Sequence, residues 1–239
     1  MLIANLDIIL PCYNPHEGWT NDLLTHLADL QASLGEVCVH LIIVNDGSTQ
    51  IIDNQCFIDI KKQHSDTTFV NYTENKGKGN AVREGLKVTK YAFQLYTDID
   101  FPFQKEGMIE AYRALQNGID VVIGNRKASY ETKLRPYRKL LSIGSHLFNK
   151  HLLGLPYIDT QGGMKAFNAL GREQMLATKI NRYLFDTEFI MRCVRKKNIK
   201  IKEVFIETRE GIQLSEMGFS VLKKEIGNII RLLKVRLGA

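Results

Sequence analysis

Two aspartates separated by one residue carry the clearest chemical signal in the chain. Asp98 and Asp100 close the stretch LYTDID, residues 95–100, after a short apolar run of the kind that forms a buried strand. Side chains two apart on a strand point to the same side, and two such carboxylates repel unless a cation neutralises both. Mg²⁺ and Mn²⁺ bind hard oxygen ligands and commonly use one or two carboxylates with substrate phosphates. The pair predicts a metal–diphosphate site; the alternative is one aspartate capping the next helix and one in solvent.

Two glycine-containing loops could contact the same ligand. In VNDGST, Asp46 is placed to accept hydrogen bonds from a nucleobase N–H or a ribose hydroxyl, although Asn-Asp-Gly is also a simple turn signal. In NKGKGNAVREG, residues 75–85, Lys76 and Lys78 open a predicted helix, where phosphate or base contacts are favourable. This stretch matches neither the dinucleotide fingerprint nor the GK[ST] of a P-loop.

Basic residues follow in the middle of the chain. Arg126, in GNRK, comes directly after a predicted strand, and Arg135 and Arg138 lie in a stretch rich in lysine that could bind a second phosphate group. Taken alone, Arg126 is better explained as an ordinary surface arginine.

Acidic residues appear again in DTQGGMKAF and LFDTEF. Asp159 precedes a Gly-Gly pair, which suggests close approach of the backbone to a ligand. Asp186 and Glu188 stand at a predicted helix start, where they complement the helix dipole or provide a base that faces the metal site.

The elements that must position these residues alternate in the first half of the chain. Apolar strands separated by helices predict an α/β fold with a mostly parallel sheet covered by helices on both faces. Predicted strands are 4–10, 38–44, 67–72, 92–97 and 119–124, with helices near 20–34, 50–64, 79–89 and 104–117. Ligands of such sheets bind beyond the carboxyl ends of the strands, where PCYNP, NDGST, ENKGKG and DIDFP should meet. The second half predicts a loop running into a short strand within 153–167, a helix at 184–197, a strand at 199–206 and a final helix at about 214–237.

Composition limits the class of protein. The chain has 239 residues, 44% of them hydrophobic, and a formal net charge of +6, which suggests an anionic partner. No basic run is interleaved with aromatic residues, so we predict no nucleic-acid partner. The four scattered cysteines fit a reducing compartment, and the N-terminus lacks the pattern of a signal peptide. We expect a cytoplasmic protein, either free or peripheral on the cytosolic face of a membrane.

Seven motifs between about residues 5 and 210 resemble the family 2 inverting glycosyltransferases. They are P-x-Y-N, N-D-G-S, N-x-G-K-G-x-A-x-R-x-G, D-x-D, G-x-R, D-T-Q-G-G-x-K-x-F and F-D-x-E. Their order is most similar to the branch that holds dolichyl-phosphate glucosyltransferases and mannose synthases. The chain differs from those synthases at Pro102, where they can use a metal-binding glutamine.

The resemblance implies a fold, a site and a reaction. It implies a GT-A fold, with Mg²⁺ or Mn²⁺ held by Asp98 and Asp100. The nucleotide-sugar site would comprise Pro11, Tyr13, Asn14, Asp46, Lys78, Asp98, Ile99 and Arg126. Catalytic roles would fall to Asp186, Asp159 and Arg126, and Arg135 and Arg138 would bind an acceptor phosphate.

The reaction implied is metal-dependent, inverting transfer of a hexose from a nucleotide sugar, with UDP favoured over GDP, to a polyprenyl phosphate in cell-envelope glycan biosynthesis. One alternative is the same chemistry on a sugar hydroxyl of a surface polysaccharide or glycolipid; another is a non-catalytic nucleotide or nucleic-acid binding module. A sugar hydroxyl would need a carboxylate base such as Asp186, whereas a phosphate would already be a nucleophilic dianion.

One domain is expected over residues 1–239. It divides into a nucleotide-binding half (1–125), an acceptor-binding half (126–212) and a C-terminal amphipathic helix (213–239). Lys223, Lys224, Arg231 and Lys234 share one face of that helix. Such a helix can lie in a membrane interface, or it can pack on the domain or in a homodimer.

Overall fold

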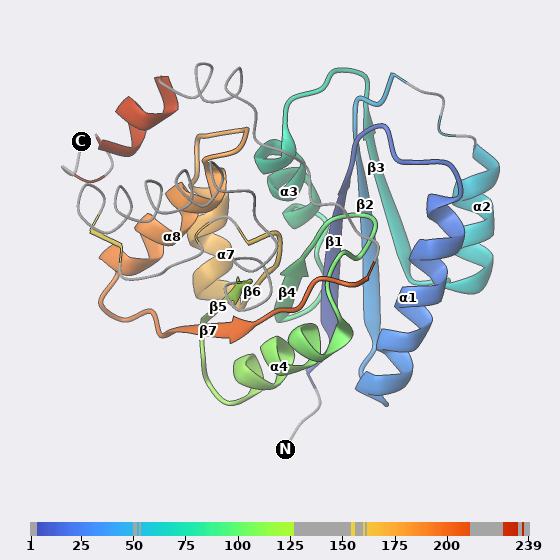
Figure 1. Ribbon diagram of the computed structural model, residues 1–239, viewed down its shortest axis with the longest axis horizontal. Helices are drawn as coiled ribbons and strands as arrows, with labels where there is room; N and C mark the ends of the chain where they lie inside the picture. The colour runs from blue at the N-terminus through green and yellow to red at the C-terminus, as the bar shows by residue number, and fades with distance from the viewer. Residues whose placement is uncertain are drawn as a thin grey trace.

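The chain forms a seven-stranded sheet with helices on both sides (Figure 1). The computed structural model describes residues 4–49, 52, 54–126, 154–155, 160, 162–210, 227–233 and 236. The strands are β1 (Leu6–Cys12), β2 (Val39–Asp46), β3 (Thr67–Tyr72), β4 (Phe93–Tyr96), β5 (Val121–Asn125), β6 (Lys165–Phe167) and β7 (Ile201–Phe205). The helices with defined bounds are α1 (Trp19–Leu34), α2 (Asn54–Gln63), α3 (Lys78–Leu86), α4 (Lys105–Gln116), α7 (Ala169–Leu176) and α8 (Phe185–Arg195).

The sheet is mostly parallel, as the sequence predicts. Its strand order is β3-β2-β1-β4-β6-β5-β7, and only β6 runs against its neighbours. Since β4 and β5 both pair antiparallel with β6, they point the same way as β1, β2 and β3. The loops after all five strands therefore lie at one edge of the sheet.

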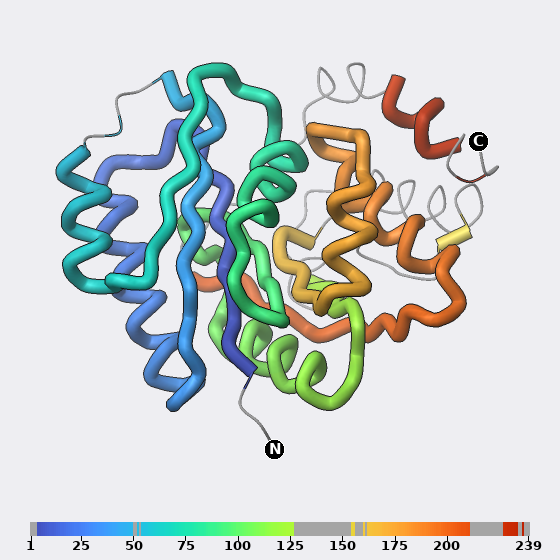
Figure 2. The backbone as a smooth tube through the Cα atoms, turned by 180° about the vertical axis from the view of Figure 1, so that it is seen from behind, coloured from blue at the N-terminus to red at the C-terminus, as the bar shows by residue number. Residues whose placement is uncertain are grey.

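Alternating strand residues fill a core on each face. Ile8 and Leu10 of β1 pack with α1, α2 and α4, whereas Ile9 faces the layer of α3, α7 and α8. Figure 2 shows the second layer from behind, with α3 beside the pair α7 and α8. Both faces of the sheet are buried, which explains why its strands read as nearly continuous apolar runs.

Two strands extend beyond their predicted ends. Pro11 and Cys12, predicted in a loop, are the last residues of β1, and Asn45 and Asp46 are the last of β2. The β1–β2 ladder continues to the pair Cys12 and Asn45, while β4 pairs with β1 only as far as Ile9. Pro11 thus lies where β1 has a partner strand on one side only, a position that tolerates proline.

In the described part of the second half, one helix was not predicted from the sequence. α7 follows β6 after a single residue, Asn168, whose side chain accepts a hydrogen bond from the Leu170 N–H at 2.9 Å. The short strand β6 and the helix α8 are confirmed, and β7 is shorter than the predicted 199–206.

The final predicted helix lies partly outside the described residues. Residues 227–233 are helical, and Leu232 is fully buried against the layer of α3, α7 and α8. Ile230, two positions before Leu232, is 53% exposed. This part of the helix packs on the domain, and Arg195 of α8 donates a hydrogen bond to the Arg236 carbonyl oxygen.

Candidate active site at the carboxyl edge of the sheet

The loops after β1 and β2 are joined by Asn14. Its backbone N–H donates to Ser48 Oγ at 3.0 Å, and its side-chain carbonyl accepts from the Thr49 N–H at 2.9 Å. Asn14 has a φ of 45°, in the left-handed region that asparagine tolerates better than most residues. Its neighbour Tyr13 is 48% exposed, so an aromatic ring is presented at this edge.

Asp46 organises the glycine-rich loop after β3. Its two carboxylate oxygens accept hydrogen bonds from the backbone N–H groups of Lys76 and Gly77, both at 2.8 Å, and from the Tyr72 hydroxyl at 2.7 Å. A Cβ atom on Gly47 would lie 2.4 Å from the carbonyl carbon of Glu74, so only glycine lets the two loops approach this closely. The two glycine-containing motifs thus form one surface.

Lys78 and Asp98 form an ion pair in which the lysine side chain is 31% exposed and the aspartate 39%. Lys78 Nζ donates to Asp98 Oδ1. Burial alone would lower the pKa of Lys78, but the carboxylates of Asp98, Asp186 and Asp100 raise it above its usual value. The lysine therefore remains a cation among three carboxylates.

Asp98 and Asp100 have the chemistry of a cation site. Burial and the neighbouring charge of Asp98 raise the pKa of Asp100, so the protein does not fully compensate the pair. Added positive charge would stabilise both carboxylates as anions. Among the described residues there is no group of three or more His, Cys, Asp or Glu side chains able to hold a metal. The pair fits a cation that takes its remaining ligands from substrate phosphate and water.

Arg209 fastens the loop that carries these aspartates. Its guanidinium donates to the backbone carbonyls of Asp100 and Phe101. Its backbone N–H donates to the Pro102 carbonyl at 2.9 Å. Phe101 has a φ of 45°, an unusual value for a bulky residue. The arginine comes from the segment after β7, more than a hundred positions away, and it also contacts His26 of α1. Arg209 was not predicted from the sequence, because no recognisable motif surrounds it.

Asp186 is buried and has two polar partners. Its Oδ1 accepts a hydrogen bond from the Tyr96 hydroxyl and lies 3.2 Å from Lys165 Nζ. Burial, followed by the charge of Asp186, raises the pKa of Tyr96 well above its usual value, so the phenol remains protonated. Lys165 is completely buried.

Glu188 and Arg83 hold the segment before α8 from two sides. Glu188 Oε2 accepts from the N–H groups of Lys179 and Ile180, both at 2.8 Å, and Arg83 donates to the Ile180 carbonyl at 3.0 Å. A Cβ atom on Gly79 would lie 2.7 Å from Phe185 Cβ. The motifs N-x-G-K-G-x-A-x-R-x-G and F-D-x-E therefore pack against each other, which their separation in sequence does not reveal.

The remaining predicted residues are distributed unevenly. Pro11 is half-buried at the end of β1, Ile99 packs partly against the α1–α4 core, and Arg126 is half-buried just after β5. Asp159, Arg135 and Arg138 lie outside the described residues. The structure thus brings the predicted nucleotide-sugar and metal residues to one edge, together with Asp186.

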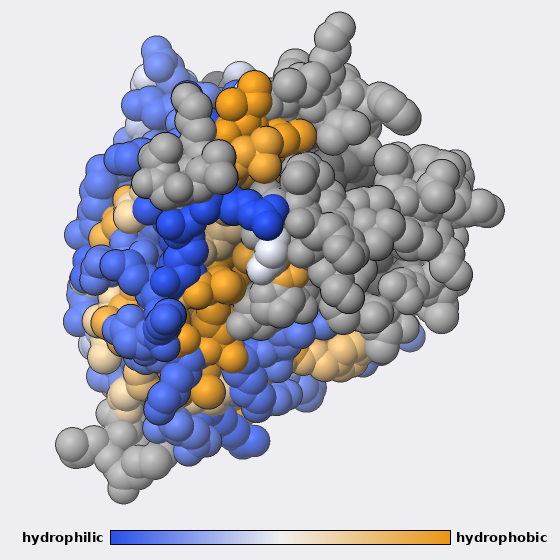
Figure 3. All heavy atoms as spheres, turned by 90° about the vertical axis from the view of Figure 1, so that its left-hand side faces the viewer, coloured by the Kyte–Doolittle hydropathy of each residue, from blue (hydrophilic) through white to orange (hydrophobic). Residues whose placement is uncertain are grey.

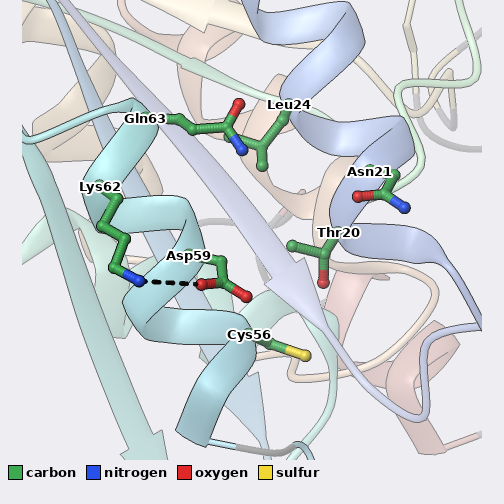
Figure 4. Close-up of a pocket in the computed structure, with 7 residues that line it drawn as sticks. All are labelled: Thr20, Asn21, Leu24, Cys56, Asp59, Lys62 and Gln63. Carbon is green, nitrogen blue, oxygen red and sulfur yellow. Dashed lines mark ion pairs between the residues drawn. The ribbon is translucent and has the colours of Figure 1, made fainter.

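A surface hollow between α1 and α2 is separate from this site (Figure 4). It contains no predicted site residue, and its polar lining includes an ion pair within α2 between Lys62 and Asp59 at 3.6 Å. The lining residues are Thr20, Asn21, Leu24, Cys56, Asp59, Lys62 and Gln63.

A mostly parallel sheet with an Asp-x-Asp pair at its carboxyl edge defines a transferase of the GT-A fold. The sequence profile of the family Glycosyl transferase family 2 matches residues 7–173. The chain belongs to this family and is a glycosyltransferase, which confirms the resemblance found in its motifs.

Two relatives match most of the chain and confirm the resemblance to the dolichyl-phosphate branch. The dolichyl-phosphate β-glucosyltransferase of Dictyostelium discoideum is 28% identical over 94% of this chain and 73% of its own length. That of Saccharomyces cerevisiae is 27% identical over 90% of this chain and 70% of its own length. A shorter match, to the poly-β-1,6-N-acetyl-D-glucosamine synthase of Staphylococcus epidermidis, is 36% identical over 41% of this chain and 22% of that protein.

Solved structures share the fold. Glucosyl-3-phosphoglycerate synthase from Mycobacterium tuberculosis, in complex with UDP, has a TM-score of 0.68 at 17% identity, over 98% of this chain and 80% of that one. Mannosyl-3-phosphoglycerate synthase from Rubrobacter xylanophilus has a TM-score of 0.67 at 16% identity, over 98% of this chain and 74% of that one. These likenesses confirm the predicted GT-A architecture.

No helix among the described residues is long and apolar enough to cross a membrane. The face in Figure 3 is largely hydrophilic where described residues are drawn, with a hydrophobic band through its middle.

Proposed function

We propose that this glycosyltransferase transfers a hexose from UDP-hexose to a polyprenyl phosphate, with inversion and with Mg²⁺ or Mn²⁺ as cofactor. The observation that carries the proposal is the under-compensated pair of Asp98 and Asp100 beside Lys78, in a chain similar over most of its length to two dolichyl-phosphate β-glucosyltransferases. Structures of the M. tuberculosis synthase of the same fold contain UDP with Mg²⁺ and UDP-glucose with Mn²⁺, which supports UDP and a divalent cation here.

The donor would lie across the carboxyl edge of the sheet. Tyr13, with Pro11 and Asn14, would contact the nucleoside, and Asp46 would hold the loop 76–77 in place or accept a hydrogen bond from the base. Lys78 would turn from Asp98 toward the diphosphate, because a phosphate oxygen competes for the same cation. A divalent cation bound by Asp98 and Asp100 would offset the negative charge on the departing diphosphate as a Lewis acid.

In the transfer, a phosphate oxygen of the acceptor attacks the anomeric carbon of the sugar. The bond from that carbon to the diphosphate breaks, and nucleoside diphosphate leaves with the electron pair. A phosphate monoester has its second pKa near 6, so the nucleophile is already a dianion at neutral pH and no base is needed. Asp159 and Asp186 would orient groups in the site, and Arg126, Arg135 and Arg138 would bind the acceptor phosphate.

A transfer assay tests the proposal. Full-length protein is incubated with UDP-glucose, Mn²⁺ and a short polyprenyl phosphate in detergent, and the product is identified by mass and by the anomeric signal in NMR. We expect a β-linked polyprenyl phosphoglucose with polyprenyl phosphate and none with the matching polyprenol. Transfer to a sugar hydroxyl but not to the phosphate would instead support the alternative acceptor, which the local match to the N-acetylglucosamine polymer synthase favours.

We also propose that residues 213–239 contact a membrane surface, and that the protein forms a homodimer. A polyprenyl acceptor is membrane-bound, and the basic face of that segment suits anionic lipid. Flotation with anionic liposomes, compared between the full chain and a variant lacking residues 214–239, tests the contact.

A further inference from the structure

Lys165 is a charged residue in the core of the protein. It lies on β6 directly opposite Tyr96 of β4, and its side chain is completely buried. A buried ammonium group lowers the stability of a protein unless it is paired and hydrogen-bonded, so the groups around Lys165 must neutralise its charge and accept its hydrogen bonds. Lys165 belongs to the motif D-T-Q-G-G-x-K-x-F, in which only Asp159 has a role so far.

Among the residues that the structure describes, three acceptors lie around its ammonium group. Asp186 Oδ1 lies 3.2 Å away, the Thr160 carbonyl accepts a hydrogen bond at 3.1 Å, and the Gly162 carbonyl accepts another. The carboxylate comes from α8 and the carbonyls from the backbone before β6. Lys165 therefore joins these two parts of the chain through one cation.

The next residue along that backbone, Gly163, lies beside Asp98. A Cβ atom on Gly163 would lie 2.8 Å from Asp98 Oδ2 and 3.3 Å from a ring carbon of Phe103. Gly163 is buried, and its backbone forms one wall beside the carboxylate. A small shift of this backbone would thus move Asp98 or close the space beside it.

We infer that Lys165 and Asp186 are positioning residues, whose ion pair fixes the backbone at Thr160, Gly162 and Gly163 so that Asp98 is held for the metal-bound nucleotide. This inference rests on the proposed function. It assigns Asp186 to the geometry of the donor site rather than to proton transfer, in agreement with its burial and its occupied Oδ1.

The test measures UDP affinity calorimetrically with and without Mn²⁺, together with kcat and KM for transfer to polyprenyl phosphate. Lys165→Met and Asp186→Asn should each lower the Mn²⁺-dependent UDP affinity at least fivefold and raise KM for the donor similarly. UDP affinity without Mn²⁺ should stay within twofold. Lys87→Met is the matched control, because this exposed lysine directly after α3 forms its ion pair with Glu84 of that helix.

A second variant tests the contact itself without removing a buried charge. Gly163→Ala places a methyl group against Asp98 and should lower the Mn²⁺-dependent affinity to the same extent, with little change in Tm. Gly227→Ala is its control, because a Cβ atom there meets no described residue within 4 Å. If Lys165→Met does not fold, Lys165→Gln and Gly163→Ala decide the question.

Two results would overturn the inference. The first is that Asp186→Asn lowers kcat a hundredfold or more while the Mn²⁺-dependent UDP affinity is unchanged, which is the behaviour of a base. The second is that Gly163→Ala and the Lys165 variants fold and bind UDP with Mn²⁺ like the wild type. If the wild-type protein itself shows neither Mn²⁺-dependent UDP binding nor transfer, the proposed function fails and this inference fails with it.

Discussion

Aspartates lie at both edges of the sheet, in contrasting surroundings. At the amino edge, Asp7 is completely buried and accepts hydrogen bonds from His40 at 2.7 Å and from the N–H groups of Lys90 and Tyr91 at 3.0 and 2.9 Å. At the carboxyl edge, Asp98 is 39% exposed and the pKa of Asp100 is raised by burial and by its neighbour. The first carboxylate is compensated by the fold. The pair of Asp98 and Asp100 lacks enough positive charge from the protein, and we take this lack as the sign of a site for a bound cation and its substrate.

The largest effect is expected at the under-compensated edge. Asp100→Ala should lower transfer at least about a thousandfold, equivalent to about 4 kcal/mol, because it removes half of the cation site. The free energy of unfolding should fall by less than about 1 kcal/mol or rise, since a repelling charge is lost. Steady-state kinetics and urea denaturation on the same preparation measure both. Activity within tenfold of the wild type would contradict the metal assignment.

Asp7→Ala should lower the stability of the protein and leave its activity unchanged. It leaves His40 and two backbone N–H groups without their buried acceptor, so we expect a loss of about 3 kcal/mol in the free energy of unfolding. The kcat and KM of the folded enzyme should be unchanged. Asp22→Ala, at a pair with His16 in which both side chains are more than half exposed, should change stability by less than about 1 kcal/mol. A fall in kcat for Asp7→Ala would show that the two edges are coupled.

Arg209→Ala should weaken the metal site without touching a carboxylate. Loss of its guanidinium bonds to the backbone carbonyls of Asp100 and Phe101 loosens the loop, and we expect the Mn²⁺-dependent UDP affinity to fall about tenfold, or about 1.4 kcal/mol. Arg209→Lys should not restore it, because a single ammonium cannot reproduce the forked guanidinium. Lys202→Ala, at an exposed ion pair with Glu110, is the control. Equal Mn²⁺-dependent affinity in Arg209→Ala and the wild type would limit Arg209 to a role in stability.

The smallest effect concerns the nucleoside. Tyr13→Ala should weaken UDP binding about fivefold, or about 1 kcal/mol, both with and without Mn²⁺, because an exposed ring stacks on a base without contacting the diphosphate. Ile58→Ala removes a similarly exposed apolar side chain on α2 and should leave binding unchanged. A change confined to the Mn²⁺-dependent affinity would place Tyr13 at the diphosphate instead.

The first half of the fold was predictable because β1, β2 and β5 are apolar runs buried on both faces, and because helical segments alternate with the strands. In the second half, β6 was predicted as a short strand, whereas α7, with eight residues, is too short for its periodicity to stand out. The antiparallel pairing of β6 with two neighbours also leaves no local trace in KAF, since it depends on strands far away in the sequence.

Some site residues were likewise predictable from the sequence and others were not. Asp98 and Asp100 were proposed because two carboxylates two positions apart, just after a strand, are suited to bind a divalent cation. The role proposed for Arg209 depends on backbone carbonyls more than a hundred positions away, and that proposed for Lys165 depends on Asp186 of α8 and on two backbone carbonyls, contacts that side-chain types do not encode. Asp186 was found as an acidic residue at a helix start, but its partner Tyr96 becomes visible only when β4 and α8 are packed together.

We propose that this edge of the sheet binds a nucleoside diphosphate through a divalent cation. Calorimetric titration of UDP, and then of GDP, into the protein with and without Mn²⁺ is the sharpest test. We expect UDP to bind at least tenfold more tightly with Mn²⁺ than without it, and more tightly than GDP under the same conditions. UDP affinity that is the same with and without Mn²⁺, or no binding of either nucleotide, would contradict it.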